Sequence, residues 1–174
     1  VFAVSGVEPP SVTVPSVTIA GIQGDGHVSP LVGRCVRDAE GVVTAILGSR
    51  SGQAFWVQDP DGDGNPDTSE GLLVTAPPEQ SVVAVGDRVR LAGRVEERTW
   101  RRELPVTRLF ASAVEVLERG CDLPPPVRLG EDGLTIPQPE VAAPGFAVFD
   151  RQRYAADAFE SLEGMRVLIP DPVV

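Results

Sequence analysis

The sequence of 174 residues contains no lysine, one histidine, two cysteines and no long apolar run. Without a stretch of about 18 apolar residues, it predicts no membrane-spanning helix. His27 has no second histidine and no nearby cysteine to join it, which argues against a transition-metal or histidine-based catalytic site. We therefore expect His27 to be a structural turn residue. No set of nucleophile, base and orienting group is apparent, so the sequence predicts no active site.

The charge is strongly negative, with a formal net charge of -10. This balance argues against a protein that coats nucleic acid non-specifically. All 15 basic residues are arginine, which suits bidentate phosphate recognition. A biased genome composition gives the same preference, so the absence of lysine decides little.

Glycine (18) and proline (17) are frequent, and the apolar runs are short and rich in valine, which favours an all-β fold. We expect a bulge or bend at Gly41, and for 109–118 an amphipathic helix stays open as an alternative. The spacing predicts a small five-stranded Greek-key barrel. The expected strands are 34–47, 54–58, 71–76, 88–98 and 109–118.

Three parts are expected along the chain. Residues 1–17 are a Pro/Ser/Val-rich leader or linker, and residues 18–120 form the barrel. Residues 121–174 begin with a proline-rich extended segment. They continue with a short helix over 150–164, capped by Asp150, and the start of a further strand unit at 165–169.

Residues 59–70 fit the calcium-loop template D-x-[DN]-x-[DN]-G-x₅-E. Oxygen ligands on a flexible loop suit a hard cation. The flanking segments are strand-like, so the two helices of an EF-hand are missing, and Pro60 and Pro66 remove backbone donors. The alternative is a solvated loop in which Asp and Gly serve only as turn formers. The candidate calcium ligands are Asp59, Asp61, Asp63, Asn65, Asp67 and Glu70.

Residues 88–108 hold seven arginines against three glutamates, a local excess of four positive charges. Trp100 lies among these arginines, a pairing that single-strand binders use for stacking and phosphate contact. Trp56 is a second stacking candidate if it faces outward from its strand while Phe55 faces the core. The alternative is a solvated hairpin. The candidate contacts are Trp56, Arg98, Trp100, Arg101, Arg102 and Arg108, together with the loop at 48–53.

Taken in order, four segments resemble the OB-fold module of secreted bacterial nucleases of the endonuclease/exonuclease/phosphatase superfamily. They are IAGIQGDGHVSPLVGRCV, EGVVTAI, FWVQDPDGDGNPDTSEGLLV and VAVGDRVRLAGRVEE. The resemblance covers residues 18–118 firmly and 121–174 loosely. It implies an OB-like barrel that serves as a secreted or cell-surface bacterial accessory domain.

The same resemblance implies a nucleic-acid partner, DNA rather than RNA, and no membrane partner. It also implies a downstream metal-dependent phosphodiesterase domain that needs magnesium or a similar ion, whereas this chain carries no catalytic residues. Composition alone leaves two free thiols and a disulfide equally open, and a secreted setting favours a Cys35–Cys121 disulfide. The calcium ion expected from the loop template would be structural. The alternative function is a structural or interaction domain that positions a neighbouring hydrolase without touching nucleic acid. A carbohydrate-binding or adhesive module is a third and weaker alternative.

Overall fold

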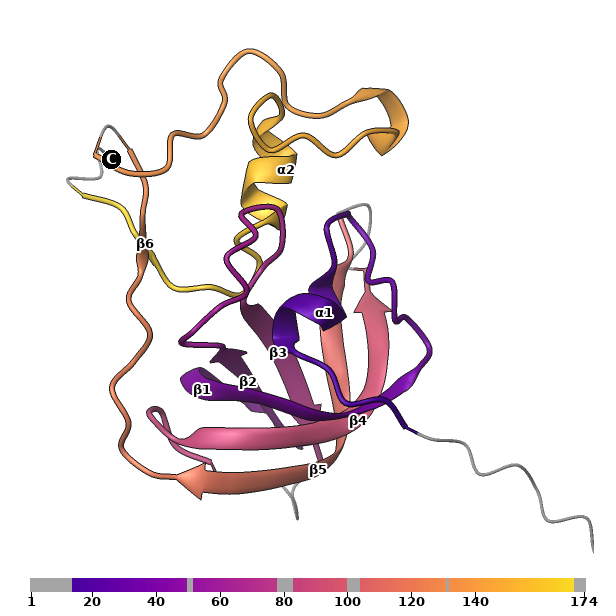
Figure 1. Cartoon of the computed structure of the whole chain (residues 1–174), viewed down its shortest axis with the longest axis vertical. Helices are drawn as coiled ribbons and strands as arrows, with labels where there is room; N and C mark the ends of the chain where they lie inside the picture. Colours follow the sequence, from indigo (N-terminus) through magenta and orange to yellow (C-terminus); the bar gives the residue numbers. More distant parts are fainter. Residues whose placement is uncertain (1–13, 50–51, 78–82, 100–103, 131, 171–174) are drawn as a thin grey trace, which may run out of the picture.

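A computed structural model describes residues 14–49, 52–77, 83–99, 104–130 and 132–170 (Figure 1). The barrel strands are β1 (Cys35–Ser49), β2 (Gly52–Gln58), β3 (Gly71–Ala76), β4 (Arg88–Arg98) and β5 (Val106–Glu118). The other elements are α1 (Ile19–Gln23), β6 (Val127–Arg128), a 3-10 turn η2 (Pro144–Phe146), α2 (Ala155–Glu160) and β7 (Val167–Leu168).

The five long strands close into a barrel in the order β1-β2-β3-β5-β4. Neighbouring strands are antiparallel except β3 and β5, which run parallel. The prediction of an all-β, five-stranded OB-like Greek-key barrel is therefore confirmed. The run 109–118 lies within β5, which settles the alternative between strand and helix in favour of the strand.

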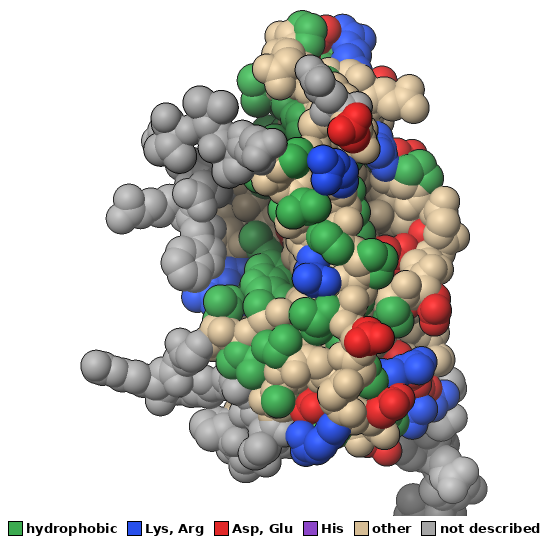
Figure 2. All heavy atoms as spheres, turned by 90° about the vertical axis from the view of Figure 1, so that its left-hand side faces the viewer, with side chains coloured by type: hydrophobic (Ala, Val, Ile, Leu, Met, Phe, Trp, Pro, Cys, Tyr) green, Lys and Arg blue, Asp and Glu red, His purple; other side chains and the backbone are tan. Residues whose placement is uncertain are grey.

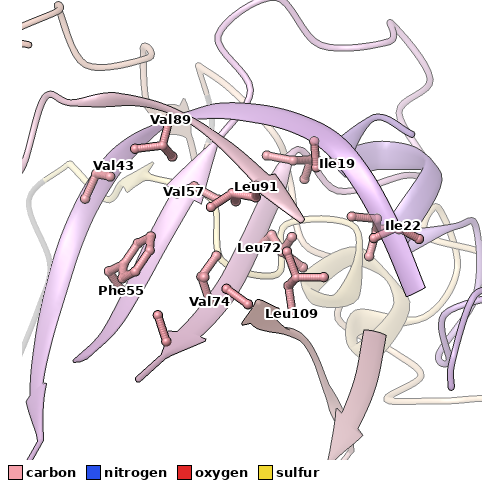
Figure 3. Packing of buried hydrophobic residues seen from close by; sticks show 14 of the residues in the cluster. Ile19, Ile22, Val43, Phe55, Val57, Leu72, Val74, Val89, Leu91 and Leu109 are labelled. Carbon is pink, nitrogen blue, oxygen red and sulfur yellow. The ribbon is translucent and has the colours of Figure 1, made fainter. Parts of the chain in front are cut away.

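The barrel interior is filled by every second residue of each strand, as a strand with one buried face requires. In β4, Val89, Leu91 and Val95 are fully buried, and arginines stand between them on the outer side. Phe55 is the largest fully buried side chain and lies among valines and leucines of the other strands (Figure 3).

A short helix adds to this core. Thr18 caps α1 by accepting a hydrogen bond from the Gly21 amide at 3.1 Å, and Ile19 and Ile22 are completely buried in the cluster (Figure 3). The sequence indicates no helix here, because five residues are too few to display a helical period.

Beyond the barrel, the chain runs extended through its proline-rich segment, and β6 then pairs in parallel with β7. The short C-terminal helix is confirmed, but α2 begins after Tyr154 rather than at Asp150. Asp150 instead accepts a hydrogen bond from the Gln152 amide at 3.0 Å. No helix within the described ranges is long and apolar enough to cross a membrane. The division of the chain at residues 17 and 120 stays a prediction.

The bulge or bend expected at Gly41 is wrong. Gly41 pairs regularly with Val89, and the bulges of β1 fall between Val36 and Ala39 and between Val43 and Ala45.

The predicted disulfide is the second correction, because Cys35 and Cys121 are both free. Cys35 pairs with Arg94 near one end of β4. The Cys121 amide donates to the carbonyl of Gly86, which lies just before the other end of β4 at Arg88. The length of a strand therefore separates the thiols, well beyond the reach of a disulfide.

The core predicts a sharp contrast between two phenylalanines. Phe55→Ala should lower the free energy of unfolding by about 3–5 kcal/mol, because it leaves a cavity in a closed barrel. Phe159→Ala, at a residue that is 55% exposed, should cost less than about 0.5 kcal/mol. Urea denaturation of both variants measures the difference, and equal losses would contradict the assigned core.

Candidate nucleic-acid interface

One row of side chains crosses the open outer surface of the barrel, and we name it the Phe110 row. The register places Ala54 of β2 opposite Thr75 of β3, Thr75 beside Phe110 of β5, and Phe110 opposite Arg94 of β4. Phe110 faces outward because its neighbour Leu109 is fully buried in the core. The row therefore brings an aromatic ring and a guanidinium together on one surface, whereas the hydroxyl oxygen of Thr75 between the strands is buried.

Phe110 is 49% exposed although it lies on a barrel strand. Arg94 is also exposed and makes no hydrogen bond or ion pair with any residue in the described ranges. An exposed ring beside an unpaired arginine offers a stacking surface and a phosphate contact. The sequence analysis missed both residues. The alternation of buried Leu109 and Ala111 around Phe110 is the signal that could have found them.

A second row, which we name the Trp56 row, lies next to the first. Trp56 of β2 is opposite Leu73 of β3, which pairs with Arg108 of β5. Phe55 is fully buried and Trp56 faces outward, which fulfils the condition for Trp56 as a stacking candidate. Trp56 is nonetheless half-buried, because Gly164 packs on its ring so closely that a Cβ there would lie 2.5 Å from Cζ3.

The remaining edge of Trp56 borders an open pocket of about 200 Å³. The pocket is lined by Thr44, Ala45, Trp56, Gly164, Met165 and Arg166. The predicted stacking residue is thus on the expected surface, but the C-terminal part of the chain shares that surface with it.

The predicted arginines differ in availability. Arg108 is held by Glu96, with Nη2 to Oε2 at 2.6 Å. Arg98 ends β4 with an exposed side chain and is engaged with other residues. Trp100, Arg101 and Arg102 lie outside the described residues, as do residues 50–51 of the loop at 48–53, so these assignments stay predictions.

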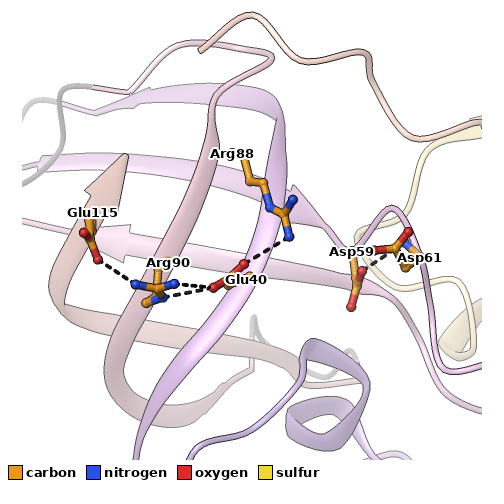
Figure 4. A network of polar contacts seen from close by, with 6 residues as sticks. All are labelled: Glu40, Asp59, Asp61, Arg88, Arg90 and Glu115. Atoms are coloured by element: carbon orange, nitrogen blue, oxygen red, sulfur yellow. Dashed lines mark hydrogen bonds and ion pairs between the residues drawn. The ribbon is translucent and has the colours of Figure 1, made fainter. Parts of the chain in front are cut away.

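Arginines at the start of β4 are also neutralised (Figure 4). Glu40 accepts from Arg88 at 3.1 Å and from Arg90 at 2.8 Å, and Arg90 reaches Glu115 at 3.3 Å. Three of the seven arginines of residues 88–108, namely Arg88, Arg90 and Arg108, are therefore held in ion pairs along the barrel. Arg94 lies further along the same strand and differs from them, because it carries no such partner within the described residues.

The acidic loop that joins β2 to β3 folds through a series of side-chain to backbone hydrogen bonds. The Asp61 amide donates to Asp59 Oδ1 at 3.0 Å, the Asn65 amide to Asp63 Oδ1 at 2.8 Å, and the Asp67 amide to Asn65 Oδ1 at 3.1 Å. Such turns are what Asp and Asn form without any ligand. The carboxylates are thereby partly occupied, and the described residues contain no group of three acidic, histidine or cysteine side chains arranged to hold a metal.

Glu70 closes this loop and behaves differently. Its Oε1 accepts from the Asp63 amide at 2.8 Å, whereas Oε2 is buried and has no hydrogen-bond partner in the described part of the chain. Burial raises the pKa of Glu70 above its ordinary value of 4.5, and the negative charges of Asp63 and Asp59 raise it further. The hydrogen bond from the Asp63 amide acts in the opposite direction and lowers it. An unpaired carboxylate oxygen in a negative surrounding is a feature that a cation relieves.

The parallel pairing of β3 and β5 places the starts of both strands at the same end of the barrel. The acidic loop precedes β3, and Arg98 at the end of β4 pairs with Val106 at the start of β5, so the acidic loop and Arg98 share that end. Elsewhere, charges are interspersed. On the side that carries β6 and β7, arginines and carboxylates alternate around hydrophobic side chains (Figure 2).

No protein-family model matches the chain, and no curated protein matches it. Among solved structures, it is similar to a protein described as an aspartyl-tRNA synthetase from Leishmania major Friedlin. The identity is 11% and the TM-score 0.45, over 68% of this chain and 23% of that one. It is also similar to OBody AM2EP06, solved bound to hen egg-white lysozyme. There the identity is 17% and the TM-score 0.42, over 66% of this chain and 99% of that one. Likenesses this weak carry no conclusion about activity. The barrel itself defines an OB-like domain.

The contact between Gly164 and Trp56 generates a prediction with a matched control. Gly164→Ala should raise the acrylamide quenching of Trp56, because the added Cβ would overlap the indole ring. Gly145 has a similar positive φ of 64°, but no atom lies within 4 Å of a Cβ built there. Both variants carry the backbone cost of about 1–2 kcal/mol, and only the first disturbs the ring. Equal quenching in the two variants would argue against the packing of Gly164 on Trp56.

Proposed function

We propose that this OB-like barrel is a non-catalytic module that binds single-stranded nucleic acid, DNA rather than RNA, along the Phe110 row. The observation that carries the proposal is the exposed Phe110 ring, which lies beside Thr75 and opposite an exposed Arg94 that has no partner among the described residues. Stacking on an aromatic side chain accepts any base, and a neighbouring arginine contacts the backbone. OB folds bind oligonucleotides on this kind of barrel surface.

The charge distribution supports a single strand held by stacking rather than a duplex held by a basic surface. The chain has a net charge of -10, and Arg88, Arg90 and Arg108 are paired with carboxylates. Few phosphates are then neutralised on binding, so affinity should depend only weakly on salt.

The biological setting belongs to the same proposal. The resemblance of residues 18–118 to the OB-fold module of secreted bacterial nucleases supports a role as an accessory domain outside the cell. Catalysis would reside in a metal-dependent phosphodiesterase domain of the same parent chain, with magnesium or a similar ion. The role of this chain would be to hold the strand near that domain.

The proposal includes a calcium ion in the acidic loop. The template match and the orphaned Oε2 of Glu70 support it, because a bound cation would pair that oxygen and offset the mutual repulsion of the carboxylates. Its role would be to stiffen the loop and to reduce the negative charge that the loop brings to the Arg-rich end of the barrel. The oxygens would come from Asp59, Asp61, Asp63, Asn65, Asp67 and Glu70.

Binding should depend on the Phe110 row. Phe110→Ala should weaken the binding of a fluorescent oligothymidine by about 1–3 kcal/mol, the usual value of one stacked base. Arg94→Gln should weaken it less and lower the salt dependence by about one unit of slope. Fluorescence anisotropy at low and moderate salt measures both effects.

Two exposed residues away from the row serve as controls. Phe159→Ala and Arg128→Gln remove the same chemical groups from α2 and β6 and should leave the affinity unchanged. If the native chain fails to bind, or if Phe110→Ala binds as well as the native chain does, the structural-domain alternative is favoured over nucleic-acid binding.

Calcium should stabilise the fold through Glu70. At a concentration 100 times the dissociation constant, it should add about 2.7 kcal/mol to the free energy of unfolding relative to a chelator. Glu70→Gln should abolish most of this gain, whereas Asp132→Asn, at an exposed aspartate outside the loop, should retain it. Thermal melts with calcium and with chelator test this, and a melting temperature indifferent to calcium would leave the loop as a plain connection.

A further inference from the structure

The C-terminal arm, residues 150–166, crosses the end of the barrel that carries the acidic loop (Figure 1). Hydrogen bonds link it to the barrel. Ser69 Oγ donates to the Glu163 carbonyl at 2.6 Å, and the Arg166 amide donates to Gln58 Oε1 at 2.9 Å. Gly164 also packs closely on the Trp56 ring.

The arm contributes little to the barrel core. Tyr154 and Ala158 are buried, yet neither belongs to the cluster of buried residues that fills the barrel. A segment attached by polar contacts at its edge separates from a barrel more easily than one whose side chains complete the core.

The arm also brings carboxyl groups together under partial burial. Glu163 Oε1 accepts from Gln23 Nε2 of α1 at 3.2 Å and from the Thr107 amide of β5 at 3.1 Å. Glu97 of β4 accepts from the Ser29 amide at 2.8 Å and from Thr107 Oγ1 at 3.0 Å through Oε1, while its Oε2 is buried without a partner in the described residues.

Two further acidic groups lie on α2. Glu160 is half-buried and feels the charges of Glu163, Glu97 and Asp157. Asp157 is completely buried, but it is compensated, with His27 Nε2 2.7 Å from Oδ1 and the Asp150 amide 2.7 Å from Oδ2. Gln23, Ser29 and Thr107 offer neutral donors to this cluster. The charges of Glu163 and Glu97 act on Glu160, and that of Glu97 acts on Glu163.

We infer that the arm is a pH-controlled cover of the Trp56 row, docked while its carboxyl groups are protonated and released when they ionise. Release would uncover Trp56 and Leu73 and extend the Phe110 row into a wider recognition surface. The regulatory consequence for nucleic acid rests on the proposed function, whereas the movement of the arm does not.

The direction of the pH dependence follows from the two glutamates on the arm. Burial, with the neighbouring acidic charges, raises the pKa of Glu160 to about 8. Burial likewise raises the pKa of Glu163 to about 7, although the Gln23 and Thr107 hydrogen bonds oppose the rise. The docked arm therefore holds protons that a free arm gives up near the ordinary value of 4.5. Docking of the arm is strongest at acid pH and weakens as the pH rises above 4.5. Beyond about pH 8 both glutamates are ionised in the docked arm, so the stabilisation from their bound protons is lost.

The expected size is large enough to measure. Each unit by which the docked pKa exceeds the pH is worth a factor of ten in the docking equilibrium. After allowance for solvent screening of these half-exposed groups, docking should weaken by about one to two orders of magnitude between pH 6 and pH 9.

The test uses the full chain with Trp100→Phe, which leaves Trp56 as the only tryptophan of the two in the sequence. Acrylamide quenching is followed from pH 6 to pH 9 with a chelator present, so that the acidic loop stays free of metal. Quenching of Trp56 should rise with a midpoint between pH 7 and pH 8, where the two glutamates ionise. A flat profile would overturn the inference.

Paired variants identify the groups responsible. The double variant Glu160→Gln and Glu163→Gln keeps the shape and the hydrogen-bond acceptors, so its quenching should stay at the low-pH value through pH 9. Glu118→Gln, at an exposed residue on β5, should titrate like the parent. A rise that persists in the double variant would also refute the mechanism.

Oligothymidine binding at the two pH values separates this inference from the proposed function. Tighter binding at pH 9 than at pH 6, lost in the double variant, supports both. A pH-dependent Trp56 signal without binding at either pH keeps the cover and rejects the binding function. Binding that depends on Phe110, together with Trp56 quenching that does not change with pH, keeps the binding function and rejects the cover.

Discussion

The parallel pairing of β3 with β5 is the contact on which the rest of the molecule depends. Only three residue pairs make it, from Leu73 with Arg108 to Thr75 with Phe110. Without it the sheet would stay open, and two edge strands would present unpaired backbone groups. The same pairs set the two outward rows, because they fix which side chains of β3 and β5 stand side by side. Closure and recognition surface thus come from one short ladder.

Much of the barrel could be predicted from the sequence, since β3 and β4 begin and end at the expected residues. Their alternating apolar residues and their glycine and proline boundaries are local signals. The orientation of Phe55 and Trp56 followed from the same alternation, with one residue in the core and its neighbour outside. The features that the sequence did not predict are of two kinds. Some, such as α1, are too short to show a helical period, and others depend on contacts between residues distant in sequence.

The candidate site shows the same limit. An arginine-rich stretch predicts free positive charge, but the pairing of Arg88 and Arg90 with Glu40 depends on the register of β1 against β4. The free thiols have the same origin, because only the strand arrangement places Cys35 and Cys121 far apart. Conversely, Arg94 and Phe110 gain their importance from facing one another across β4 and β5, which no local motif records.

The double role of β1 has a consequence for how the molecule unfolds. Val42 pairs with Gln58 of β2 on one side and with Arg88 of β4 on the other, so this strand belongs to both halves of the barrel. Neither half can lose β1 without opening the other. The barrel should therefore melt as one cooperative unit, whereas the arm outside that ladder forms a separate unit of lower stability. Amide hydrogen exchange would then show two classes of protection along a single chain.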